Sequence, residues 1–171
     1  MLFICLSVYQ VIRYIYIFSV YLYLNCLLTQ NGNFDGLGVC RWPDGRIYEG
    51  EWKNDRIQGR GKFAYADSSV YEGEWRHGDR HGLGVFTTPE GVYEGEYVND
   101  YKEGSGTFRW KTGFLYEGDF KAGNREGRGV FTHPAILGGA VENGVWRQDK
   151  FLQACSCHLQ PKKCKCFESI E

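Results

Sequence analysis

Four copies of one five-residue pattern constrain the fold of this chain more than any other feature. The pattern is Tyr-Glu-Gly, an acidic residue and an aromatic residue, and successive copies start 23, 22 and 23 residues apart. A fixed period of this length indicates a repeat architecture in which each unit is one supersecondary element. The copies occupy residues 48–52, 71–75, 93–97 and 116–120.

Each unit continues with a polar loop, a Gly-x-Gly triplet and an aromatic residue two positions later. In the first unit these are Gly59, Gly61 and Phe63. Both halves of the unit alternate with period two, which is typical of β-strands. Loops rich in Gly, Asn and Asp close hairpins. Each repeat is therefore predicted to be one β-hairpin.

Tight turns are predicted to join one hairpin to the next. Pro43 with Gly45 and Pro89 with Gly91 stand at equivalent positions, and they suit such turns because proline presets its own φ and glycine accepts a positive φ. Residues 36–42 resemble the second half of an earlier unit and 144–146 the first half of a last one. Residues 135–141 form an irregular insertion.

The predicted fold is all-β: a single-layer, twisted antiparallel sheet of stacked β-hairpin repeats, forming an open ribbon. Full units start at Tyr48, Tyr71, Tyr93 and Tyr116, and with the partial units at both ends we expect ten strands. One layer has no second sheet to bury its aromatic face. We therefore expect a terminal helix, a second copy or a partner to cover that face.

The aromatic stripe is the main candidate site for partner binding, because aromatic side chains dominate binding hot spots and a large exposed apolar face marks an interface. The same rings also pack on one another and on the glycines. The stripe consists of Tyr48, Trp52, Phe63, Tyr65, Tyr71, Trp75, Phe86, Tyr93, Tyr97, Phe108, Trp110, Tyr116, Phe120 and Phe131.

The opposite face carries the two acidic residues of each repeat, which we expect to be solvated among cations. Equivalent acids lie two strands, about 10 Å, apart, too far to share one ion or one proton. The face remains a candidate docking surface for a basic partner. His77 and His81 lie four residues apart, but they belong to a glycine-containing loop and lack the helical face that such a pair needs to form a zinc site.

These motifs resemble those of the MORN (membrane occupation and recognition nexus) repeat family. Its units carry Tyr-Glu-Gly-Glu-Trp, a polar loop, Gly-x-Gly with an aromatic, and a closing Asp-Gly, and the match covers residues 31–151. The resemblance implies a hairpin-stack sheet without activity of its own, used as a scaffold or adaptor in ciliary, cytoskeletal or membrane-junction assemblies. Tyr97 and Phe120 in place of Trp, and Cys40 in place of an aromatic, depart from the pattern.

The two terminal segments differ in composition from the repeats. Residues 1–30 are an apolar segment whose stretch 2–28, interrupted by Arg13, is long enough to span a membrane. It is interpreted as a membrane anchor, a helix over the sheet, or a mistaken start of the gene model. Residues 152–171 are expected to be a disordered tail. Its Cys155, Cys157, His158, Cys164 and Cys166 are weak candidates for a metal site, or its cysteines for acylation.

Composition narrows the function. The net charge of −1, without a basic stripe, argues against a nucleic-acid partner. Of seven cysteines only Cys40 lies within the repeats, which favours a reducing, cytoplasmic setting over a disulfide framework. We find no catalytic motif and expect no cofactor. The predicted function is a non-enzymatic scaffold that binds proteins, with self-association as a homodimer included. The alternatives are a membrane tether anchored by residues 2–28 and a regulatory fragment of a larger MORN-containing enzyme.

Overall fold

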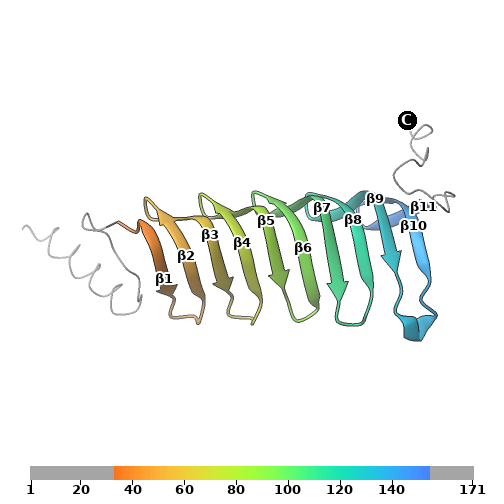
Figure 1. Cartoon of the computed structure of the whole chain (residues 1–171), viewed down its shortest axis with the longest axis horizontal. Coiled ribbons are helices and arrows are strands. Elements are labelled where there is room, and N and C mark those ends of the chain that lie inside the picture. Colours follow the sequence, from red (N-terminus) through yellow and green to blue (C-terminus); the bar gives the residue numbers. More distant parts are fainter. Residues whose placement is uncertain (1–32, 155–171) are drawn as a thin grey trace, which may run out of the picture.

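Residues 33–154 are described by the computed structural model, and they form one open antiparallel sheet. Its eleven strands pair strictly in chain order, so that Figure 1 shows them as the rungs of a long ribbon with β1 at one end and β11 at the other. The strands are β1 (Gly36–Arg41), β2 (Ile47–Lys53), β3 (Arg56–Ala64), β4 (Val70–Arg76), β5 (Asp79–Thr87), β6 (Gly91–Val98), β7 (Tyr101–Trp110), β8 (Leu115–Lys121), β9 (Asn124–Thr132), β10 (Val141–Arg147) and β11 (Lys150–Ala154).

The predicted fold class and the hairpin repeats are confirmed, but the predicted number of strands is wrong. The described residues contain eleven strands rather than ten, because Lys150–Ala154 pairs with β10 and completes a fifth hairpin. This segment carries neither a Gly-x-Gly triplet nor the following aromatic, so nothing in its pattern marked it as a strand. The insertion between β9 and β10 contains a short 3-10 helix, Ala135–Leu137.

A continuous row of glycines crosses the ribbon, one from each strand between β1 and β10. On one face, which we call the tyrosine face, the first tyrosine of each repeat lies over the glycine pair of its own hairpin. A Cβ atom added to Gly61 would overlap the ring of Tyr48, and one added to Gly84 would overlap that of Tyr71. The row consists of Gly38, Gly50, Gly61, Gly73, Gly84, Gly95, Gly106, Gly118, Gly129 and Gly144.

Each of the hairpins β2–β3, β4–β5, β6–β7 and β8–β9 contains a bulge just beyond its glycine pair. In β2–β3 the pair Gly50–Gly61 is followed by the pair Trp52–Ile57, so three residues of β3 oppose one residue of β2. The first glycine of the Gly-x-Gly triplet lies in this bulge and has a positive φ, 67° at Gly59. Glycine adopts such a backbone without strain, and a Cβ atom at this position would also overlap the Glu51 carboxylate. This requirement explains the first glycine of the triplet.

The aromatic residue that lies beyond each bulge packs over the tyrosines, and together these rings form the core. The Trp75 ring packs edge-on against Tyr71 of its own repeat at 5.0 Å and against Tyr48 of the preceding repeat at 5.8 Å. The same pair of contacts recurs along the ribbon, ending at Tyr116 and Trp146. Edge-to-face pairs at these distances are favourable beyond their buried area. The bent hairpins thus cover much of their own aromatic face, a cover that the sequence analysis had assigned to another element.

Replacing a glycine of the row tests this packing. Gly84→Ala should lower the free energy of unfolding by about 2–3 kcal/mol, because the added methyl group collides with the buried Tyr71 ring and neither strand can move aside alone. Gly38→Ala is the control, since its methyl group would meet Trp52 at an ordinary 3.5 Å. Chemical denaturation followed by circular dichroism measures both. Equal stability of the two variants would contradict the packing described.

Candidate functional site

The structure divides the fourteen predicted aromatic contact residues into two groups. The first tyrosines of the repeats, Tyr48, Tyr71, Tyr93 and Tyr116, have no exposed surface, and Phe63, Trp75, Tyr97 and Phe120 are at most 7% exposed. The other six pack against this core and remain partly accessible: Trp52, Tyr65, Phe86, Phe108, Trp110 and Phe131. A partner can touch only this second group without opening the sheet. Partner binding there stays a prediction.

The buried tyrosines keep one polar contact inside their own repeat. The Tyr48 hydroxyl donates to the Glu51 carbonyl oxygen at 2.9 Å, and the Tyr71 hydroxyl donates to that of Glu74 at 3.0 Å. The same bond recurs at Tyr93 and Tyr116. Burial raises the pKa of all four phenols above their ordinary value. They therefore act as neutral core groups.

Three long cationic side chains, each from the second strand of its hairpin, lie over aromatic rings of the core. The Arg80 guanidinium lies 5.1 Å from the Tyr97 ring centre, the Lys102 ammonium 4.6 Å from that of Phe108, and the Arg125 guanidinium 4.4 Å from that of Trp146. Cations at such distances are attracted to the ring face. Burial lowers the pKa of Lys102. Cationic side chains therefore cover part of the aromatic core on this face.

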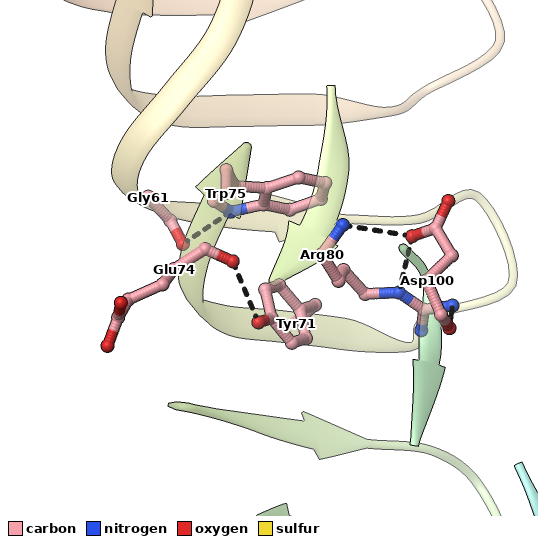
Figure 2. Close-up of polar contacts among 6 residues, drawn as sticks. All are labelled: Gly61, Tyr71, Glu74, Trp75, Arg80 and Asp100. Carbon is pink, nitrogen blue, oxygen red and sulfur yellow. Dashed lines mark hydrogen bonds and ion pairs between the residues drawn. The ribbon is translucent and has the colours of Figure 1, made fainter. Parts of the chain in front are cut away.

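Adjacent hairpin tips are held together by an ion pair that the sequence analysis missed. Figure 2 shows Arg80 with Asp100 of the next hairpin: Asp100 Oδ1 accepts from Arg80 Nε and from the Arg80 amide, both at 3.0 Å. Arg125 and Asp149 repeat these contacts. Trp75 Nε1 also joins neighbouring hairpins by donating to the Gly61 carbonyl oxygen at 3.1 Å. The sequence carries one signal for these ion pairs: an arginine in one hairpin is followed by an aspartate in the next, both at Arg80 and Asp100 and at Arg125 and Asp149.

The face opposite the tyrosine face is the acidic face. It carries two rows of side chains, formed by the first and the second acidic residue of each repeat. The two rows have different roles, whereas the sequence analysis had assigned both to solvent. Second-row carboxylates bind the backbone at the bulges: Glu51 Oε1 accepts from the Arg60 amide at 2.8 Å, and Asp119 Oδ2 from the Arg128 amide at 3.1 Å. The first-row residues are exposed, and they are Glu49, Glu72, Glu94 and Glu117. The first row is therefore the more available of the two to a partner.

A long open groove of about 1060 Å³ runs across the strands on this acidic face, from β2 to β8. Glycines of the row form its floor. Its walls carry Glu49, Arg60, Lys62, Glu72, Glu74, Leu83, Val85, Glu94, Ser105 and Thr107. No tyrosine or tryptophan lines it. A long concave surface of the described residues thus lies opposite the aromatic face that the sequence had favoured.

The structure places His77 at the turn of the β4–β5 hairpin and His81 in strand β5. Within residues 33–154 no three histidine, cysteine, aspartate or glutamate side chains are grouped so that they could hold a metal ion. The weak candidates Cys155, Cys157, His158, Cys164 and Cys166 lie outside the described residues. Cys40 is buried in strand β1.

The part of the chain that the structure describes contains no helix with the length and apolarity needed to cross a membrane. Residues 2–28, the predicted anchor, lie outside it. The predicted anchoring therefore stays a prediction.

The fold and its surfaces define a β-hairpin repeat protein of the kind that mediates interactions with proteins or membranes. The family model of the MORN repeat matches five consecutive segments, residues 30–45, 48–70, 71–92, 93–114 and 116–135, and the chain belongs to this family. A search of curated proteins finds no significant match.

The ion pair between hairpin tips can be measured with a double-mutant cycle. We expect Arg80→Ala and Asp100→Ala to be coupled by about 1 kcal/mol, since the pair is charge-assisted but partly exposed. Arg80→Ala alone should cost more, because it also removes the cation from three rings. The exposed Arg76→Ala is the control in the same hairpin. Additive effects of the two substitutions would show that the tips are not coupled.

The buried phenols also predict a pH dependence. Because their pKa is raised in the folded state, they stabilise the fold fully below the ordinary tyrosine pKa of about 10 and lose that effect as the pH rises above it. Alkaline titration followed by tyrosinate absorbance and circular dichroism should show these phenols ionising together with unfolding. Complete tyrosinate formation in a protein that keeps its sheet would be inconsistent with their burial.

Proposed function

We propose that the protein is a non-enzymatic scaffold that binds partner proteins along its length, and that the groove on the acidic face receives a basic segment of a partner. The observation that carries this proposal is the groove itself, which crosses seven strands and has charged walls and a glycine floor. A scaffold needs an extended surface that several partner residues can contact at once.

The charge of the groove favours a basic occupant. Its walls hold four carboxylates (Glu49, Glu72, Glu74, Glu94) and two cations (Arg60, Lys62), a net charge of −2. Lys62 lies 3.6 Å from Glu72, so this carboxylate is partly neutralised. Complementary potentials guide association and select among partners.

The spacing of the acids further describes the occupant. Glu49, Glu72 and Glu94 belong to alternate strands, so they recur about every 10 Å along the ribbon. A polyproline II segment advances about 3.1 Å per residue with three residues per turn, so basic residues three positions apart lie on one side of it, opposite successive acids. Leu83 and Val85, 62% and 37% exposed, offer apolar contact between them.

The proposal assigns no catalytic role, and it places the protein in the cytoplasm, in a cytoskeletal or ciliary assembly as the sequence analysis expected. A membrane tether remains the second candidate, because residues 2–28 are apolar and long enough to span a bilayer. In that arrangement the repeats would still bind a partner from the membrane surface.

Photo-crosslinking from single positions tests which face meets partners. A benzophenone side chain at Val85 lies in the groove, whereas one at Tyr65 lies on the partly accessible aromatic surface. We expect protein adducts in cells from position 85. Glu49→Gln, Glu72→Gln and Glu94→Gln combined should remove most of them, since these changes delete the charge and keep the shape.

Two results would contradict this assignment. Adducts formed from position 65 and not from 85 would show that partners bind the aromatic surface instead of the groove. Adducts from position 85 that persist in the triple glutamine variant would show that the groove binds by something other than its charge. Circular dichroism of the purified variants controls for folding.

A further inference from the structure

The tip of the β6–β7 hairpin differs from the other four tips of the ribbon. Two positions flank the turn of every hairpin, and in β6–β7 they hold Val98 and Tyr101, 41% and 59% exposed. The equivalent residues of the other hairpins are charged or polar throughout: Lys53, Arg76, Lys121 and Arg147 at the first position, and Arg56, Asp79, Asn124 and Lys150 at the second. A turn that faces solvent does not need apolar side chains at these two positions. The presence of Val98 and Tyr101 there therefore needs another explanation.

The cation of the same hairpin also lacks the partner that its counterparts have. Arg80 and Arg125 are each paired with an aspartate of the next tip, Asp100 and Asp149. Lys102 occupies the equivalent position, but the next tip carries Gly123 where the aspartate would be. Within the described residues Lys102 forms no ion pair. At the two remaining equivalent junctions the position of the cation is held by Phe34, opposite Asp55, and by Ile57, opposite Gly78, so neither has a cation to pair.

The backbone at this junction is arranged as in the paired ones. Gly123 donates to the Lys102 carbonyl oxygen at 3.0 Å, as Asp100 does to that of Arg80. In the paired junctions the aspartate also accepts from the backbone amide of the arginine (Figure 2). By its place in the repeat, the Lys102 amide is directed at the same position. The Lys102 ammonium lies over Tyr93, Phe108 and Phe120, which are equivalent to the three rings that the Arg80 guanidinium covers. By this equivalence the ammonium and the amide both lie beside the position where the paired junctions have a carboxylate.

Space for an incoming group is present. A Cβ atom added to Gly123 would meet only the Tyr101 ring, at 3.9 Å, which is an ordinary contact. The vacant carboxylate position thus lies beside an exposed aromatic ring.

We propose that Lys102, Gly123 and the exposed Tyr101 and Val98 form a docking site for a partner segment that presents an aspartate or glutamate next to an apolar side chain. The carboxylate takes the position that Asp100 takes against Arg80, and the apolar neighbour packs on Tyr101. A charge-assisted hydrogen bond beside an aromatic anchor is a common basis of binding hot spots. This site is separate from the acidic groove and selects the opposite charge.

The full-length protein can be tested with synthetic hexapeptides of the design x-x-(Asp/Glu)-(Leu/Tyr/Trp)-x-x. A second library with Asn and Gln at the third position removes only the charge. We expect binding from the acidic library and not from the amide library. For the tightest acidic peptide, Lys102→Met should reduce the affinity about tenfold or more, because it removes the cation while keeping the stem of the side chain.

In the Gly123→Asp variant, the chain's own aspartate carboxylate would occupy the position proposed for the partner's carboxylate. Aspartate is compatible with the positive φ here, since Asp100 and Asp149 have φ of 71° and 65° at the equivalent turn positions. This variant should lose peptide binding by a similar factor and should melt at a higher temperature than the wild type. Gly78→Asp is the matched control, because it changes the same turn position beside Ile57, where no cation is present, and should bind the peptide normally.

Three results would overturn the proposal: no acidic peptide bound, equal binding of the amide library, or unchanged binding by Gly123→Asp. Crosslinking from Val85 concerns the groove on the other face. Failure of one site therefore leaves the other unaffected.

Discussion

The contact of a tyrosine ring with a pair of glycines on neighbouring strands is the constraint on which the rest of the structure depends. A single-layer sheet cannot bury large side chains between two layers, so it must bury them against its own backbone. Gly50 and Gly61 leave the space that the Tyr48 ring fills, and the ring closes that space completely. The bulge then brings Trp52 back to 5.2 Å from the same ring. A repeat of about 23 residues thereby gains a core without a second sheet.

Both surfaces follow from this arrangement. On the tyrosine face the rings are largely enclosed, and two of the cations over them, Arg80 and Arg125, pair with an aspartate of the neighbouring tip. On the other face the same glycines leave bare backbone between two rows of side chains, which is the floor of the acidic groove. The residues that make the fold and the residues that are available to a partner therefore lie mainly on opposite faces, as in other solenoid-like proteins whose repeats contact only their neighbours.

Much of the fold could be predicted from the sequence because the same pattern of strands and turns occurs in every repeat. The period, the hairpins, the turn at Gly45 and the separation of aromatic from acidic residues all follow from alternation and spacing. Gly91, in contrast, begins β6 without the positive φ predicted for it. The bulge could not be predicted, because a shift of two residues leaves the alternation of each strand intact. That shift is why Glu51 binds the Arg60 amide instead of solvent and why the hairpins cover their own rings.

The sites were harder to predict than the fold. Aromatic residues mark both cores and interfaces, and the sequence could not separate Tyr71, which is fully buried, from Tyr65, which is partly accessible. The ion pair between Arg80 and Asp100 joins residues 20 positions apart, and only the stacking of the tips shows that they meet. The vacancy beside Lys102 becomes visible only after the paired junctions are known.

Hydrogen–deuterium exchange along the chain tests the central role of the tyrosine–glycine contact most directly. The account predicts the slowest exchange in the strand segments around the glycine row in the middle repeats, where opening requires displacement of a buried ring, and faster exchange at the hairpin tips. Protection that is highest at the tips, or uniform along the strands, would contradict the account, because the ribbon would then be held by something other than this contact.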